Sequence, residues 1–168
     1  MRTTFASVAL TALGACTVIA PAPNVGAGTR ASIAISVGPC FGFCPVYDAK
    51  ITADGAVSFG GIRHTALLGK RERRAGPRTY GALDADLAPF RPVDGATAEI
   101  SCAAEISDMP TYTITWTGTD GQKTVATHHA GCSEGAGRDF DIVLRGVPRR
   151  LGIEEWMKQT TWPGVSRG

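Results

Sequence analysis

The segment from Gly38 to Tyr47, GPCFGFCPVY, limits the folds open to this chain more than any other stretch. Its two cysteines, Cys40 and Cys44, are four residues apart among glycine, proline and aromatic residues. A disulfide between them needs Cα atoms within about 7 Å, which a tight turn provides and an extended strand of that length does not. Gly42 and Pro45 favour a turn. We therefore expect a sharp, disulfide-closed turn that leads into a strand.

The first residues have the pattern of a secretion signal. Arg2 gives a positive start, and Phe5 to Ala15 is an uncharged, mostly apolar run that is too short to span a bilayer. The run ends in Leu-Gly-Ala-Cys16, which resembles the lipobox of bacterial lipoproteins, where cleavage before the cysteine leaves it to carry a lipid. We expect residues 1–15 to be removed and Cys16 to be lipidated. The alternatives are an ordinary cleaved signal, with Cys16 as a bystander, and an uncleaved anchor.

The segment after Cys16, up to residue 31, has the composition of a flexible tether. It consists largely of alanine, proline and glycine and carries one charge. Thr17, in place of an aspartate, resembles the pattern of Gram-negative lipoproteins that are released to the outer membrane. The sequence thus predicts a domain at residues 32–158, held by a lipid at the periplasmic face of the outer membrane, and a loose tail at residues 159–168.

The size and charge of the chain limit its domain count and its partners. Its 168 residues suffice for one domain with its own core but not for two. Loss of Arg2 with the signal lowers the formal charge from +2 to +1, which gives no electrostatic footprint for nucleic acid. The 21 glycines and 10 prolines favour many turns and short elements.

Several short runs alternate apolar and polar residues, the pattern of strands with one buried face. The predicted strands are residues 32–37, 46–52, 56–59, 62–68, 111–117 and 123–128. Asp54-Gly55 between two such runs is a strong hairpin signal. Three- and four-residue spacing predicts helices at residues 80–90 and 138–147, the second ending near Pro148, and a short amphipathic piece follows at residues 153–157. This order indicates an α+β domain with two helices packed on a sheet of antiparallel hairpins.

The order of short motifs resembles the DUF6438 family of bacterial exported proteins and lipoproteins. The motifs are C-x-x-x-C-P-x-Y (Cys40, Cys44, Pro45, Tyr47), D-G-x-V-x-F (Asp54, Gly55, Val57, Phe59) and D-x-P-T (Asp108, Pro110, Thr111). The likeness runs from about Ser32 to Val147. Because the function of this family is unknown, the resemblance implies a fold and a location but no reaction, substrate or catalytic residue. The basic segment at residues 70–78 and the sequence after Pro148 depart from the family pattern.

Without Cys16, the mature chain keeps four cysteines, and an even number in an exported domain indicates disulfides. Three pairings are open from the sequence alone. We expect Cys40–Cys44 and Cys102–Cys132. The chain-entropy estimate is about 2 kcal/mol for the short loop and roughly 3.5 to 4 kcal/mol for the long one.

Two other uses of these cysteines have less support. A redox-active dithiol usually occupies a C-x-x-C motif at the start of a helix, whereas Cys40 and Cys44 are one residue further apart and lead into a strand. A four-cysteine zinc site would need a second close pair, but Cys102 and Cys132 are far apart in sequence, and an exported setting favours oxidation. We therefore expect neither a metal nor a cofactor.

The segment from Gly131 to Gly135 matches the G-x-S-x-G motif of α/β-hydrolases and lies between a strand and a helix. That fold places its histidine after the serine, but all three histidines precede Ser133: His64, His128 and His129. We therefore expect a glycine-rich turn here and no catalytic residue.

Neighbouring residues of a strand point to opposite faces, so at most one of His128 and His129 can join Cys132 or a carboxylate in a site. We expect both histidines to be polar residues near a strand end. The carboxylates around Cys102 show no sign of converging on a substrate: Glu99, Glu105 and Asp108. Asp108, which precedes Met109-Pro110, is expected to cap a turn.

One segment is strongly basic, with Lys70, Arg71, Arg73, Arg74 and Arg78. A tethered domain could place such a cluster on anionic lipid or polysaccharide. Glu72 and the low net charge favour a solvated polar loop instead.

These features together predict a lipid-anchored, non-catalytic binding or structural module, with an envelope protein or an anionic polymer as its partner. One alternative is a hydrolase inhibitor that presents Phe41-Gly42-Phe43, because a rigid loop loses little entropy on binding. The other is a thiol oxidoreductase that uses Cys40 and Cys44.

Overall fold

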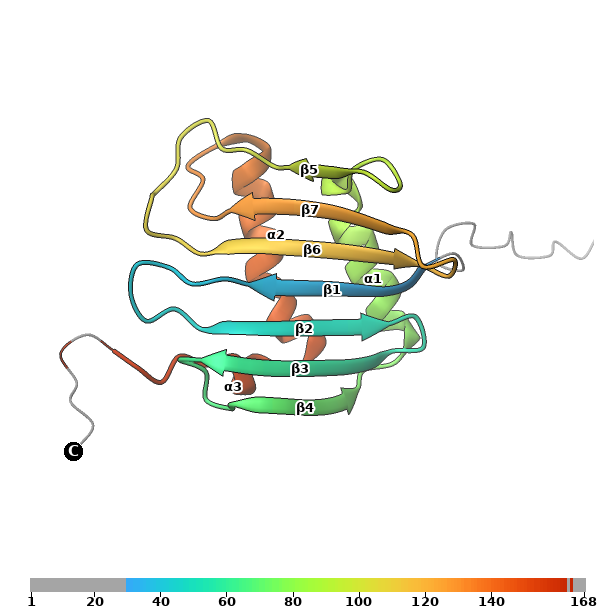
Figure 1. The fold of residues 1–168 in the computed structure, drawn as a ribbon, viewed down its shortest axis with the longest axis horizontal. Coiled ribbons are helices and arrows are strands. Elements are labelled where there is room, and N and C mark those ends of the chain that lie inside the picture. The colour runs from blue at the N-terminus through green and yellow to red at the C-terminus, as the bar shows by residue number, and fades with distance from the viewer. Residues whose placement is uncertain (1–29, 163, 165–168) are drawn as a thin grey trace, which may run out of the picture.

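A seven-stranded sheet forms the centre of the computed structural model, which describes residues 30–162 and residue 164. The strand order is β4-β3-β2-β1-β6-β7-β5 (Figure 1). The strands are β1 (Arg30–Val37), β2 (Val46–Thr52), β3 (Ala56–Arg63), β4 (Gly69–Arg74), β5 (Thr97–Glu99), β6 (Thr111–Gly118) and β7 (Lys123–His129). The helices are α1 (Pro77–Leu87), the 3-10 turn η1 (Ala88–Phe90), α2 (Gly135–Leu151) and α3 (Glu154–Met157). The predicted signal, Cys16 and nearly all of the tether lie outside the described residues.

The sheet is antiparallel except at one edge. β1 pairs with β2 and β6, β3 with β2 and β4, and β6 with β7, all antiparallel. β5 instead runs parallel to β7. The predicted α+β class is therefore confirmed, with both hairpins in place. β5 is an additional strand, and its three exposed residues have no apolar alternation that could have revealed it.

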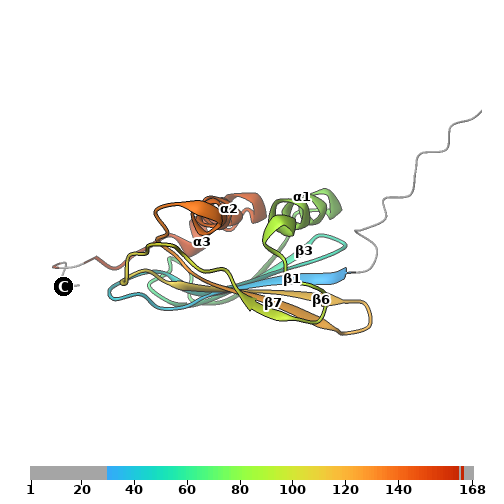
Figure 2. The same ribbon diagram turned by 90° about the horizontal axis from the view of Figure 1, so that it is seen from above.

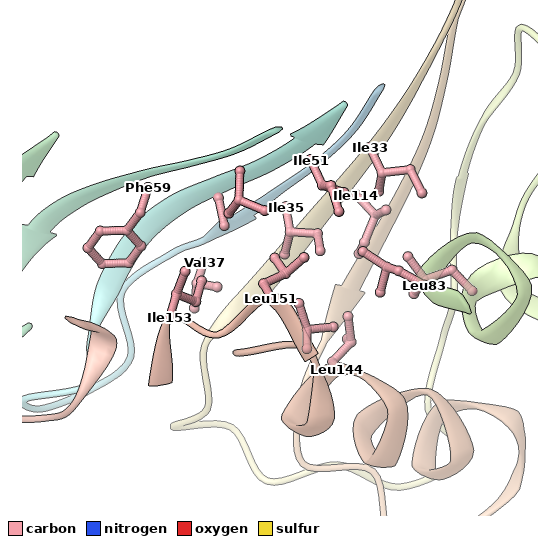
Figure 3. Close-up of a cluster of buried hydrophobic side chains, with 14 of the residues drawn as sticks. Ile33, Ile35, Val37, Ile51, Phe59, Leu83, Ile114, Leu144, Leu151 and Ile153 are labelled. Carbon is pink, nitrogen blue, oxygen red and sulfur yellow. The ribbon is translucent and has the colours of Figure 1, made fainter. Parts of the chain in front are cut away.

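The core lies between the sheet and the two long helices, which cover one face of the sheet (Figure 2). Alternate residues of β1, such as Ile33 and Ile35, point towards the helices, and Leu83 of α1 and Leu144 of α2 point back at them (Figure 3). Trp116 of β6 is also buried on this face. Burying each large apolar side chain contributes about 1.5 to 3 kcal/mol of transfer free energy, and the sum of these contributions holds the helices on the sheet.

The predicted loop at residues 70–78 is wrong in its first half, because that part forms β4. Its six residues pair with β3, while all their side chains are exposed. An edge strand that buries no side chain lacks the apolar alternation by which strands are recognised, and lysine and arginine are common on such edges.

The predicted strand at residues 62–68 is also wrong. β3 ends at Arg63, and His64 adopts a left-handed conformation with φ 59°.

Helix α2 starts earlier and ends later than predicted. It begins at Gly135 and includes Pro148, which was expected to stop it. Pro148 lies in the last turn, where its carbonyl accepts a hydrogen bond from the Ile153 amide. The helix is capped after Leu151 by Gly152, whose φ of 66° suits a glycine. Across the described residues, no helix is long and apolar enough to cross a membrane.

Candidate functional site

Both expected disulfides are present. Cys40 and Cys44 are bonded with Cα atoms 5.8 Å apart, and Cys102 and Cys132 with Cα atoms 5.2 Å apart. The first bridge follows the end of β1, and the second joins the loop before β6 to the turn after β7. These segments all lie at the same end of the sheet (Figure 1).

The Cys40–Cys44 loop presents an aromatic side chain to solvent. Phe41 is 88% exposed, the highest value among the large apolar side chains of the described residues. The Gly42 amide donates to the Cys40 carbonyl across 2.9 Å, so the turn is closed by a main-chain bond as well as by the disulfide. The Phe43 ring meets the His64 ring edge-on, with centroids 5.3 Å apart. Phe41 is therefore carried on a braced turn.

Three loops meet here, and we call residues 38–45, 62–68 and 104–110 the loop end. The Phe41 amide donates to the Asp108 carbonyl, which joins the first loop to the third. The Phe43–His64 contact joins the first loop to the second. The loop end also exposes the apolar side chains Ile62, Leu68 and Ile106.

A buried histidine–aspartate pair lies beside the second disulfide. His128 of β7 is fully buried, with Nδ1 2.7 Å from the Ile100 carbonyl oxygen and Nε2 3.0 Å from Oδ1 of Asp141 in α2. The other carboxylate oxygen of Asp141 accepts hydrogen bonds from the Gly131 and Cys132 amides, both at 2.9 Å. His128 Nε2 is 3.9 Å from Cys132 Sγ. Sheet, helix and disulfide thus meet at one polar cluster.

The sequence pattern did not predict this cluster. His129 fits the expected polar position near a strand end, but His128 does not, because it is buried. As expected for neighbours on opposite faces of a strand, His128 reaches Cys132 and a carboxylate and His129 does not. One signal could have found the pair: Asp141 falls in the apolar stripe of α2, four residues after Gly137 and three before Leu144. A carboxylate in such a stripe needs a buried partner.

The pair also acts on a nearby tyrosine. Burial raises the pKa of Tyr112, and the negative charge of Asp141 raises it further, while Arg145 opposes this. An open hollow of about 320 Å³ borders the cluster, and Cys132, Asp141 and Arg145 are among its lining residues. The cluster is therefore buried but lies directly below the surface.

A family model described as a domain of unknown function, DUF6438, matches residues 31–146. The chain belongs to the DUF6438 family. The match begins in β1 and ends inside α2, so it includes both disulfides and the His128–Asp141 pair. No curated protein matches the chain.

The DUF6438 motif residues whose surroundings the structure defines belong mainly to its framework. Tyr47 is buried against Phe59, with ring centroids 5.5 Å apart, and burial, aided by the charge of Tyr112, raises its pKa. Pro110 is buried and its carbonyl accepts the Ala130 amide. Pro45 is half-buried where the disulfide loop enters β2. These positions support the sheet.

The Asp54-Gly55 motif makes the turn between β2 and β3. Hydrogen bonds from Thr52 and Arg74 and from the Ala56 amide lower the pKa of Asp54. Gly55 has φ 83°, and a Cβ there would lie 2.1 Å from the Gly76 carbonyl carbon. Only glycine therefore lets this turn pack against the chain that leads into α1.

The other candidates from the sequence do not form a catalytic arrangement among the described residues. Ser133 donates its hydroxyl to the Ala104 carbonyl, and the His128 ring is bonded to other groups. His129 lies between Thr111 Oγ1 and the Ile106 carbonyl. The carboxylates Glu99, Glu105 and Asp108 are exposed, and Asp108 Oδ1 accepts from the Ser107 hydroxyl.

The basic segment is divided between two faces of β4. Arg74 pairs with Asp54 at 3.0 Å, and Arg73 donates to the Gly152 carbonyl at the end of α2. Strand alternation places Lys70 with Arg74 on one face and Arg71 with Arg73 on the other. Arg78 lies in the first turn of α1. The five cations therefore do not share one surface.

Proposed function

We propose that this DUF6438 protein is a non-catalytic, lipid-anchored module of the bacterial cell envelope that binds a partner protein through its loop end. The observation that carries the proposal is Phe41, an 88% exposed phenylalanine on a turn closed by a disulfide. Burying such a side chain in a partner's pocket gains about 2 to 3 kcal/mol of transfer free energy. Because the turn is already ordered, little of this gain is lost to conformational entropy.

The direction of β1 supports the same proposal. The described chain enters at Arg30, at one end of the sheet, and the loop end lies at the other (Figure 1). Eight extended residues of β1 separate the two by roughly 26 Å. With Cys16 lipidated and the following segment acting as a tether, the loop end would point away from the membrane, towards proteins in the periplasm.

The chemistry of the loop end indicates the kind of partner. The loop end exposes Ile62, Leu68 and Ile106 as well as Phe41, so the contact would be largely apolar. A protein with an apolar cleft fits this surface better than an anionic polymer, because the cations of β4 are divided between two faces. A hydrolase whose cleft accepts a rigid Phe-Gly-Phe turn is the second candidate, favoured by the same exposed ring.

Site-specific photocrosslinking in the envelope tests the binding proposal. A photoreactive phenylalanine at position 41 should capture one envelope protein. The same group at Val93, which is 83% exposed outside the loop end, should not. Capture at neither position, or equal capture at both, would contradict the proposal. Capture of a hydrolase, with loss of its activity on addition of the purified domain, would select the inhibitor role.

The anchor needs its own test. A Cys16→Ala variant should leave the membrane fraction and appear in the soluble periplasmic fraction, and mass spectrometry of the wild-type protein should find a lipid on Cys16. A wild-type chain that is membrane-bound without a lipid, or a variant that stays in the membrane, would contradict lipid anchoring.

A further inference from the structure

The cluster beside the second disulfide has the outer-shell arrangement of a metal site. A carbonyl oxygen can only accept a hydrogen bond, so Nδ1 of His128 must donate its hydrogen to the Ile100 carbonyl 2.7 Å away. Nε2 is therefore the nitrogen that shares a proton with Asp141. Metal-binding histidines are oriented in this way, with one nitrogen donating to a carbonyl and the other left for the ion.

The distances between donor atoms fit a metal of tetrahedral geometry. The ligand atoms of Cys102, His128 and Cys132 all lie within 4.8 Å of one another. His128 Nε2 is 3.9 Å from Cys132 Sγ and 3.0 Å from Asp141 Oδ1. Zinc bonds of about 2.3 Å to sulfur and about 2.0 Å to nitrogen or oxygen place neighbouring ligands roughly 3.3 to 3.8 Å apart. Opening the sulfur–sulfur bond and bringing Asp141 Oδ1 closer to the two sulfurs are the changes required.

We propose that the dithiol form of Cys102 and Cys132 binds one thiophilic cation, Zn²⁺ in the first instance, together with His128 Nε2. Asp141 Oδ1 would be the fourth ligand. This differs from a four-cysteine site, because Cys40 and Cys44 take no part. The hollow that reaches Cys132 and Asp141 from the surface provides an entry route. The disulfide form is unable to bind the ion, because its sulfurs are bonded to each other.

A dithiol reductant of the envelope would open the Cys102–Cys132 bond. The reductant's thiolate attacks one sulfur of the Cys102–Cys132 bond, and a mixed disulfide forms. Its second thiol then resolves this bond, so that the reductant leaves as a disulfide and both cysteines gain a proton. Binding of Zn²⁺ displaces these two protons and the one shared by His128 and Asp141. Three protons are released, and two thiolates, an imidazole and a carboxylate hold the ion.

A purely structural role for the His128–Asp141 pair is the competing explanation. The pair ties β7 to α2 and satisfies the Gly131 and Cys132 amides. A buried ion pair is, however, often no more stabilising than apolar residues of the same volume. The structural role also gives no reason for Nε2 to lie beside Cys132 Sγ.

Cobalt titration of the reduced protein tests the proposal. The full mature chain is used with Cys16→Ala, Cys40→Ser and Cys44→Ser, so that only one cysteine pair responds. After reduction with a phosphine, Co²⁺ should bind one per chain, with thiolate charge-transfer absorption and visible bands of a tetrahedral ion. Native mass spectrometry should find one Zn²⁺ in the reduced chain and none in the oxidised chain.

Matched variants separate this site from adventitious binding to thiols. His128→Ala should weaken Co²⁺ binding more than tenfold, and Asp141→Asn should weaken it 10- to 100-fold. His129→Ala, the adjacent ring on the opposite face of β7, should leave the affinity unchanged. Equal affinities of the His128 and His129 variants would overturn the proposal.

Loss of folding on reduction also gives a decisive outcome. If the reduced chain is folded by circular dichroism and binds no Co²⁺, the proposal is wrong. If it is unfolded, one equivalent of Zn²⁺ should restore the native spectrum, as in other domains that fold on metal binding. An unfolded chain that Zn²⁺ fails to refold would likewise overturn it. None of these results depends on partner binding by the loop end.

Discussion

The two disulfides lie at the same end of one sheet and have opposite surroundings. Cys40–Cys44 closes a short turn whose neighbours are aromatic rings and solvent. Cys102–Cys132 spans 30 residues and lies against a buried histidine and carboxylate. The first shapes a local surface, whereas the second joins two segments that are distant in sequence and holds them beside the His128–Asp141 pair. A covalent bond of one kind therefore has two physical roles here, and each role can be tested separately.

The largest effect is expected from the His128–Asp141 pair at the second disulfide. Asp141→Ala leaves the buried His128 Nε2 without its hydrogen-bond partner and removes the acceptor of two main-chain amides. Breaking a buried pair in this way costs about 3 to 5 kcal/mol. Urea unfolding of the oxidised protein measures the change in the free energy of unfolding. Asp139→Ala, an exposed position on the same helix, should cost no more than about 0.5 kcal/mol. Similar values for the two variants would reject a stabilising role for the pair.

The two disulfides should also differ in how much they stabilise the fold, with Cys102–Cys132 contributing more than Cys40–Cys44. Replacing Cys102 and Cys132 together by alanine should cost roughly 3.5 to 4 kcal/mol, because the unfolded chain regains the freedom of a long loop. The same change at Cys40 and Cys44 should cost about 2 kcal/mol. Unfolding curves of the two double variants, recorded without reductant, compare the bridges directly. If the short bridge proved to be the more important one, loop entropy would not be the basis of the difference.

The same contrast explains how far the sequence predicts this structure. Features set by neighbouring residues were predictable: the alternation of β1 and β6, the Asp54-Gly55 hairpin and the turn at Cys40–Cys44. Strand β4 was not predictable, because an edge strand whose side chains are all exposed has no buried face and so no apolar alternation. The His128–Asp141 contact was not predictable either, because it depends on how α2 packs on β7. A turn and a disulfide between near neighbours can be predicted from the sequence, whereas the cluster around His128 and Asp141 forms only when distant elements pack together.

Alkaline pH should act on both regions through their tyrosines. Burial raises the pKa of Tyr47, which follows the first disulfide, above the ordinary value of about 10. The folded state then holds the phenolic proton more tightly than the unfolded chain does, so stability is complete below about pH 10 and is lost as the pH rises further. One such group lowers stability by at most about 1.4 kcal/mol per pH unit.

Tyr47→Phe should therefore flatten the fall in unfolding free energy between roughly pH 10 and 11. Tyr112→Phe should do the same near the second disulfide, where burial and the charge of Asp141 raise the pKa. Urea midpoints measured across this range for wild type and both variants provide the comparison. Parallel curves for wild type and Tyr47→Phe would show that this hydroxyl is not the titrating group.

The smallest effect on stability is expected at the tip of the first disulfide loop. Phe41 is almost fully exposed, so Phe41→Ser should change the free energy of unfolding by no more than about 0.5 kcal/mol. If the loop end binds a partner, the same change should weaken binding by 2 kcal/mol or more, about 30-fold, as expected for an aromatic residue at the centre of an interface. Pull-down yield and unfolding free energy are measured on the same preparation, with Val93→Ser as the exposed control. A stability loss as large as the binding loss would mean that Phe41 supports the fold, and the division of roles between the two disulfides would then fail.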